Sequence, residues 1–344
     1  MSYAGNELIA NCFKNCSELK EISIPLNITL IGNSAFSGCS LLKRITIPSS
    51  VNFIEEHAFN GCYSLKEIVL PPTITKIEAS VFEGCSSLKE IKIPSSVVSI
   101  GDWAFSGCSS LKNITIPVDL EYIGNWVFSE CSQLSVIEIL SKLIKIENGT
   151  FASCCQLDEL VIPSFVTCIG ANAFCKCCLL TKIVIPSSVT RIGASAFSEC
   201  TSLVKITIPS TVTEIGRSCF SKCKSLKEIN ILSNLLVIDD LTFEGCSSLE
   251  HISIPQSVTV IGASAFSGCS SLKEILIHSA VTKIKSFAFA YCSSLVDFTI
   301  PSPNVLIEFK SFIGCSSLRH LFVSSSAKLN EIGINSNVKV TKID

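Results

Sequence analysis

Residues 36–58 read FSGCSLLKRITIPSSVNFIEEHA, and this stretch decides the fold. Counted from Phe36 as position 0, apolar side chains stand at 0, +3, +6, +9, +11, +15, +18 and +22. Positions +8 to +11 alternate polar and apolar residues, which is the pattern of a half-buried strand, and Ile suits such a strand. The proline at +12 ends the strand because it cannot donate a hydrogen bond to the ladder.

The same pattern recurs along the chain without insertion or deletion. Phe followed three residues later by Cys occurs fourteen times at intervals of 23 residues, from Phe13 to Phe312. A fixed period of this length indicates a solenoid in which each repeat is one coil. A single coil cannot bury its apolar face alone, so stacking on neighbouring coils must stabilise it.

The period also predicts the domain organisation. We expect a single domain over residues 1–344, with fourteen repeats from residue 13 to about 328 and a partial repeat over residues 1–12. Residues 329–344 are expected to form a shortened capping coil, with the strand motif restarting between Leu329 and Ile334. Proline is absent from the +12 position of four repeats, which carry Leu140, Leu232, His278 and Ser324.

The turns of the coil are predicted from glycine. Glycine is frequent at +2, as in Gly38, and at +19, as in Gly32, so both positions are expected to need a positive φ angle. We expect the chain between the strands to form short 3-10 or helical turns.

The segment from Leu42 to Ile47, LKRITI, is similar to the Leu-x-x-Leu-x-Leu core of leucine-rich repeats. Residues 13–323 resemble the 23-residue class of repeats found in BspA-like surface antigens. The resemblance implies a right-handed leucine-rich-repeat superhelix, rich in β-structure, with one short parallel strand per coil. It also implies adhesion or recognition at a cell surface, with partners that differ widely among members.

Composition limits the possible partners. Apolar residues make up 47% of the chain, which excludes a disordered protein, and the net charge is −2. We therefore expect no binding to nucleic acid, and no segment of about 20 mainly apolar residues predicts insertion into a membrane. Residues 1–16 do not read as a secretory signal, which indicates the cytoplasm, whereas the resemblance implies a cell surface. The location stays open.

Catalysis is not predicted. The histidines lie in distant repeats, and the sequence contains no phosphate-binding loop, nucleophile elbow or HExxH motif. Glu138 and Glu159 can approach each other only on an open face, without the enclosure that shifts carboxyl pKa values. We expect no catalytic residue, no cofactor and no metal.

Most of the 20 cysteines have a packing role. Fourteen occupy position +3, where small apolar thiols are expected to stack inside the solenoid. Outside the apolar slots lie Cys155, Cys168, Cys175 and Cys178. Unpaired surface thiols are favoured for these four; a zinc site, a Cys155–Cys178 disulfide, and a thiol or metal sensor are the alternatives.

Two surfaces are candidate binding sites. The outward strand positions +8 and +10 are expected to form the concave face. In its middle an apolar strip with charged neighbours is a candidate ligand-binding site, made of Val136, Glu138, Glu159, Val161, Lys182, Val184 and Lys205. The alternative is that these valines merely favour strands. Trp103 and Trp126 at position +21, with Tyr122 nearby, form a second candidate patch or simply cover the flank of the coil.

These observations favour a non-catalytic scaffold that binds a protein, or less readily a glycan, on its strands. The alternative is a structural protein that forms homo-oligomers through uncapped ends of the solenoid.

Overall fold

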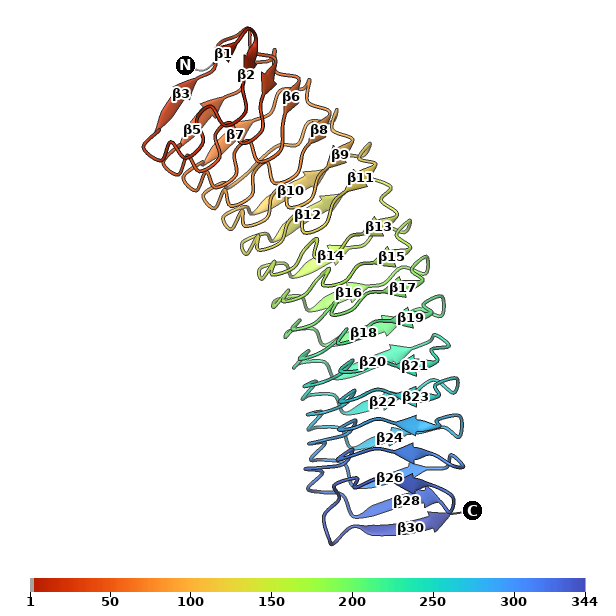
Figure 1. The fold of residues 1–344 in the computed structure, drawn as a ribbon. Helices are drawn as coiled ribbons and strands as arrows, with labels where there is room; N and C mark the ends of the chain where they lie inside the picture. The colour runs from red at the N-terminus through yellow and green to blue at the C-terminus, as the bar shows by residue number, and fades with distance from the viewer. Residues whose placement is uncertain (1–2, 344) are drawn as a thin grey trace. The chain divides into compact units, whose positions relative to one another are not determined.

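The computed structural model describes residues 3–343, and the chain divides into two compact units, Met1–Val166 and Thr167–Asp344. Each unit is a parallel β-solenoid in which successive strands pair with residues 23 positions further along (Figure 1). This confirms the predicted solenoid with one short parallel strand per coil. No described residue is helical, because isolated hydrogen-bonded turns take the place of the expected 3-10 or helical turns.

The strands at positions +8 to +11 form the first ladder of each coil. In the first unit they are β3 Glu21–Ser23, β5 Arg44–Thr46, β7 Glu67–Val69, β10 Asn113–Ile116, β12 Val136–Ile139 and β14 Glu159–Val161. In the second unit they are β16 Lys182–Val184, β18 Lys205–Ile208, β20 Glu228–Ile231, β22 His251–Ser253, β24 Glu274–Leu276, β26 Asp297–Ile300, β28 His320–Ser324 and β30 Lys339–Ile343.

A second ladder of two-residue strands follows the proline turn, at the Ile of position +18. In the first unit it contains β2 Glu7–Leu8, β4 Leu30–Ile31, β6 Phe53–Ile54, β8 Lys76–Ile77, β9 Ser99–Ile100, β11 Tyr122–Ile123 and β13 Lys145–Ile146, and β1 Tyr3–Ala4 pairs antiparallel with β2. In the second unit it contains β15 Cys168–Ile169, β17 Arg191–Ile192, β19 Glu214–Ile215, β21 Val237–Ile238, β23 Val260–Ile261, β25 Lys283–Ile284, β27 Leu306–Ile307 and β29 Lys328–Leu329.

The core of each unit is a column of phenylalanine rings. In the first unit the rings from Phe13 to Phe151 stack with centroids 5.3 to 5.9 Å apart. In the second unit the rings from Phe174 to Phe312 stack at 5.3 to 5.7 Å. Ring planes in these pairs lie within 19° of parallel, a geometry that offset aromatic pairs favour.

The cysteine column is bonded as well as buried. Each Cys Sγ of the column donates to the carbonyl of the Phe 26 residues earlier, as in Cys62 to Phe36 at 3.3 Å and Cys223 to Phe197 at 3.1 Å. Burial raises the pKa of the Cys39 thiol to about 11 and that of Cys223 to about 12. The thiols therefore stay protonated and keep their donor, which explains why the slot holds cysteine.

The Phe turns form a third ladder. Their backbone N–H groups at −2, 0 and +2 donate to carbonyls of the next coil, as Asn11, Phe13 and Asn15 do at 2.7 to 2.9 Å. Positive φ angles occur at +2, as predicted, with Gly38 at 74°. They also occur at +21, where the sequence carries Ser34 at 55° and Trp103 at 54°.

The prediction for glycine at +19 is wrong. Gly32 has no positive φ angle, but a Cβ on it would lie 2.7 Å from the backbone oxygen of Leu8. Glycine is required there because two backbones approach closely.

The last coil also differs from the prediction. Leu329 belongs to β29, which pairs with β27, and the final strand is β30 rather than a strand between Leu329 and Ile334. His320 pairs with Lys339, so this coil is shorter than the others and β30 covers the edge of β28. The shortening lies in the turn after Gly333, downstream of where the sequence motif placed it.

Candidate ligand-binding surface

The strand face, defined as positions +8 and +10 of the first ladder, is the outward side of each sheet. Its strands alternate exposed and buried residues, as in β14, because successive side chains point to opposite faces. All seven residues of the predicted strip lie on this face. Val136 is 52% exposed, Val161 85% and Val184 66%.

Four residues of the strip belong to the first unit. Val136 and Glu138 lie on β12, opposite Asn113 and Thr115 of β10. Glu159 and Val161 lie on β14, which packs beside β12 without a hydrogen-bonded ladder between the two strands. The inward residues of β12 are only half-buried, whereas β10 buries both of its inward residues. The strip therefore begins where the first sheet is interrupted.

The other three residues belong to the second unit. Lys182 lies directly opposite Lys205, and the Lys205 ammonium contacts the Glu228 carboxylate at 2.7 Å. The hydrogen bond from Lys205 lowers the pKa of Glu228. Val184 lies on the same strand as Lys182, so the structure brings these three predicted residues together around one groove.

That groove has a volume of about 550 Å³ and we call it the Leu232 groove. It is lined by Thr181, Lys182, Ile183, Val184, Ile185, Ser187, Val204, Lys205, Ile206, Thr207, Pro209 and Leu232. Leu232 is 61% exposed and stands where most repeats carry proline.

The first unit holds a matching groove of about 640 Å³, which we call the Leu140 groove. It is lined by Ile91, Lys92, Ile93, Ser95, Asn113, Ile114, Thr115, Pro117, Val118 and Leu140. Leu140 is 56% exposed and also occupies a proline position. The missing prolines are visible in the sequence, but the grooves they border depend on residues from three coils and were not predicted.

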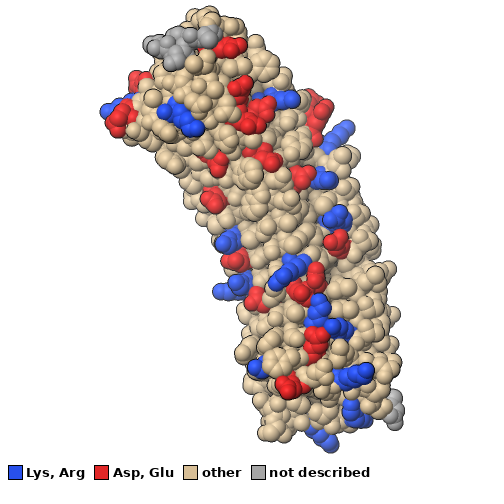
Figure 2. Space-filling view, viewed as in Figure 1, with Lys and Arg blue, Asp and Glu red and all other residues tan. Residues whose placement is uncertain are grey.

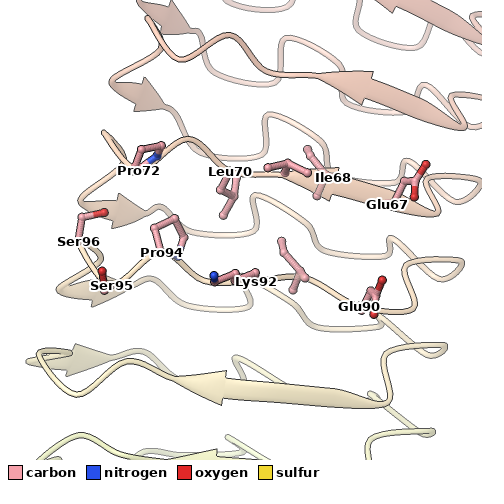
Figure 3. A pocket seen from close by; sticks show the side chains of 11 residues that line it. Glu67, Ile68, Leu70, Pro72, Glu90, Lys92, Pro94, Ser95 and Ser96 are labelled. Carbon is pink, nitrogen blue, oxygen red and sulfur yellow. The ribbon is translucent and has the colours of Figure 1, made fainter.

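Two other hollows on the strand face carry acidic side chains. One in the first unit, of about 640 Å³, has Glu67 and Glu90 at one end, Pro72, Ser95 and Ser96 at the other, and Lys92 between them (Figure 3). One in the second unit, of about 550 Å³, is lined by Glu228, His251, Glu274 and Asp297 and includes the exposed Leu276. Basic and acidic residues alternate on the visible surface instead of forming a large patch of one sign (Figure 2).

The aromatic patch is divided between exposed and packed side chains. Trp103 is 43% exposed and Tyr122 48%, whereas Trp126 is half-buried. A Cβ on Gly149 would overlap the Trp126 ring, so this indole covers the next coil. Burial, together with Asp102 and Glu147, raises the pKa of Tyr122. Trp126 thus fits the packing interpretation, and Trp103 remains available to a ligand.

The four irregular cysteines are all half-buried. Cys155 lies in the first unit and the other three lie in the second. The Cys178 thiol donates to the Lys176 carbonyl at 3.3 Å, and burial raises the pKa of Cys175. Within residues 3–343 no three His, Cys, Asp or Glu side chains converge in a way that could hold a metal ion. The disulfide and sensor alternatives stay hypotheses.

The histidines of the strand face are paired at the surface. His251 Nδ1 lies 3.4 Å from Glu274, and His320 Nδ1 lies 2.7 Å from Asp297. The described part of the chain contains no helix long and apolar enough to cross a bilayer.

Comparison with known proteins places the repeats in context. The family model described as BspA type leucine rich repeat region (6 copies) matches residues 6–135, 53–179, 167–296 and 237–343. No curated protein matches the sequence.

Solved structures give the same picture. A leucine-rich repeat protein from Bacteroides ovatus is 28% identical, with a TM-score of 0.78, and the match covers 94% of this chain and 92% of that one. A leucine rich cell surface protein from Faecalibacterium prausnitzii is 28% identical, with a TM-score of 0.53 and coverage of 92% and 76%. The pneumococcal vaccine antigen PcpA shares the fold at 20% identity, with a TM-score of 0.60 and coverage of 100% and 96%.

Proposed function

Because the chain belongs to the BspA-type leucine-rich repeat family, we propose that it is a non-catalytic recognition scaffold that binds a protein ligand on its strand face. The observation that carries this proposal is the exposure of Val136, Val161 and Val184 on strands whose inward positions are buried. Exposed apolar side chains with a charged rim are typical of binding surfaces.

An adhesive role at a cell surface is part of the proposal. It is supported by the relative from Faecalibacterium prausnitzii, which is described as a cell surface protein. The absence of catalysis is supported by the open strand face, where His251 and His320 only form exposed pairs with carboxylates. A glycan ligand is a less favoured form of the same proposal, because the strip is apolar at its centre.

The test is binding of the intact chain to arrays of purified proteins and of glycans. Val161→Lys combined with Val184→Lys should abolish the signal, because two ammonium groups would replace the exposed apolar surface. Val69→Lys is the matched control: Val69 occupies the same position +10 and is 79% exposed, but it lies outside the strip. Equal loss with both variants, or no loss with the strip variant, would refute the role of the strip.

Self-assembly through the first coil is a second candidate. Among the described strands β3 pairs on one side only. Phe13, Leu19 and Ile22 are half-buried there, where later repeats bury the same positions, and Leu26 is 85% exposed. An open strand edge with apolar neighbours favours association with another chain. Light scattering across a wide concentration range tests it, and a constant monomer mass excludes it.

A further inference from the structure

The Leu140 groove and the Leu232 groove are built to the same plan. Nine of the ten residues that line the first groove recur in the second at positions 92 residues later, which is four repeats of 23. Each groove has a floor of buried Ile side chains from two neighbouring coils and a wall formed by an exposed leucine of the third. The Leu140 groove lies within the first unit and the Leu232 groove within the second.

The two grooves share a local departure from the ordinary repeat. Leu140 and Leu232 replace proline, and their N–H groups donate to Ile116 at 3.3 Å and Ile208 at 3.0 Å. The following serines, Ser141 and Ser233, are each 2% exposed. Their hydroxyls are the two buried side-chain polar atoms of residues 3–343 that lack a hydrogen-bond partner. The same unfavourable feature therefore accompanies the same exposed leucine in both places.

Charge separates these grooves from the others on the strand face. Neither is lined by a carboxylate, whereas the hollows around Glu67 and around Glu274 are. Lys92 of the Leu140 groove and Lys182 of the Leu232 groove form no ion pair with any described residue, and Lys182 faces the like charge of Lys205. Like charges directly opposite on neighbouring strands repel, and a bound anion would relieve this repulsion.

We propose that the Leu140 and Leu232 grooves are two equivalent docking sites for extended acidic peptide segments of a partner protein. An aliphatic side chain of the segment packs against the exposed leucine, and a neighbouring carboxylate pairs with Lys92 or Lys182. One chain thus engages two such segments. This inference rests on the proposed recognition function and names the chemistry of the partner.

The probe is a fluorescein-labelled Gly-Asp-Leu-Asp-Gly peptide, titrated against the intact protein at low salt by anisotropy and calorimetry. We expect two peptides per chain and weakening by added salt, because the pairing is partly electrostatic. Gly-Lys-Leu-Lys-Gly and Gly-Asp-Ser-Asp-Gly should bind at least tenfold more weakly, since each lacks one of the two matched features.

Variants assign the sites. Leu140→Ser and Leu232→Ser should each reduce the stoichiometry from two to one, and the double variant should lose at least tenfold in affinity. Leu276→Ser is the matched control, because Leu276 is 61% exposed like Leu232 but lines the acidic hollow. These leucines are exposed, so circular dichroism should show unchanged folding.

Absence of saturable binding overturns the proposal, as do equal binding of the lysine peptide and full binding by the double variant. The outcome is separable from that of the proposed function, because Val161 lies outside both grooves. If Val161→Lys abolishes binding in the arrays while the acidic peptide does not bind, the recognition surface stands and the peptide grooves do not.

Discussion

The coils that begin at Phe197 and Phe220 are neighbours in the second unit but end their strands differently. In the first of them Pro209 ends the strand, and the Val212 N–H closes the turn on the Pro209 carbonyl at 3.1 Å. In the second, the Leu232 N–H instead donates to Ile208, and no such bond closes the turn at Leu235 among the described residues. Replacing proline by leucine thus moves a hydrogen bond from the turn to the sheet.

This difference has a consequence inside the coil. Ser233 is buried without a hydrogen-bond partner, whereas Ser49 at the same position of a proline coil is exposed. The first unit repeats the arrangement with Leu140 and Ser141. An unsatisfied buried hydroxyl costs about 1–3 kcal/mol. Sequences break such local rules most often at functional sites, which is why the leucine coils mark the grooves.

The largest predicted effect concerns what both coil types share, the buried thiols. Because burial raises the pKa of Cys39 to about 11 and that of Cys223 and Cys315 to about 12, the unfolded chain loses these protons first. Stability from the thiols is complete below their ordinary pKa of 9.0 and falls as pH rises through the folded values.

We therefore expect the free energy of unfolding to drop steeply above about pH 9, by roughly 1.4 kcal/mol per pH unit for each thiol. Urea titrations from pH 7 to 11 measure it. Cys200→Ala in a proline coil and Cys223→Ala in a leucine coil should reduce the slope equally. A flat profile would show that the thiols are not buried as described.

The second prediction concerns the aromatic column. Phe197→Ala and Phe220→Ala each remove a fully buried ring that stacks on its neighbours, so each should lower the free energy of unfolding by about 3–5 kcal/mol. Urea unfolding followed by circular dichroism compares them. A clearly smaller loss at Phe220 would mean that the leucine coil is already loosened in its core.

The third prediction reverses the defect of the leucine coils. Ser141→Ala and Ser233→Ala remove hydroxyls that have no partner, so each should raise the free energy of unfolding by about 1–3 kcal/mol. Ser49→Ala, at the exposed equivalent position, should change it by less than about 0.5 kcal/mol. Destabilisation by the buried substitutions would indicate a hydrogen bond or bound water at these serines.

The smallest effect is expected from restoring the proline. Leu232→Pro removes the bond from the Leu232 N–H to the Ile208 carbonyl, worth about 0.5–1.5 kcal/mol. It also restricts the unfolded chain, which stabilises by about 0.4–1 kcal/mol. The two nearly offset each other, so the midpoint of unfolding should hardly move, while peptide binding at the Leu232 groove is lost. A large destabilisation would show that the open turn cannot accept a proline.

The candidate surface was predictable only in part. The alternation around Val161 and Val184 placed both residues on the outward face, because the two-residue period of a strand is a local property. The pairing of Lys205 with Glu228 and the grooves beside Leu140 and Leu232 join residues 23 to 51 positions apart. Their geometry depends on how three coils stack, which no single repeat reveals.

The sequence by itself determined the period, the strand positions, the proline stops and the Phe and Cys columns, because each repeat carries the same buried slots at the same spacing. The tertiary structure alone decided that Gly32 relieves a close backbone approach, that the Cys thiols donate to Phe carbonyls of the preceding coil, and that the chain ends on β30. These features arise between coils, where the contacts depend on the distance and orientation of two backbones rather than on the residues of either one.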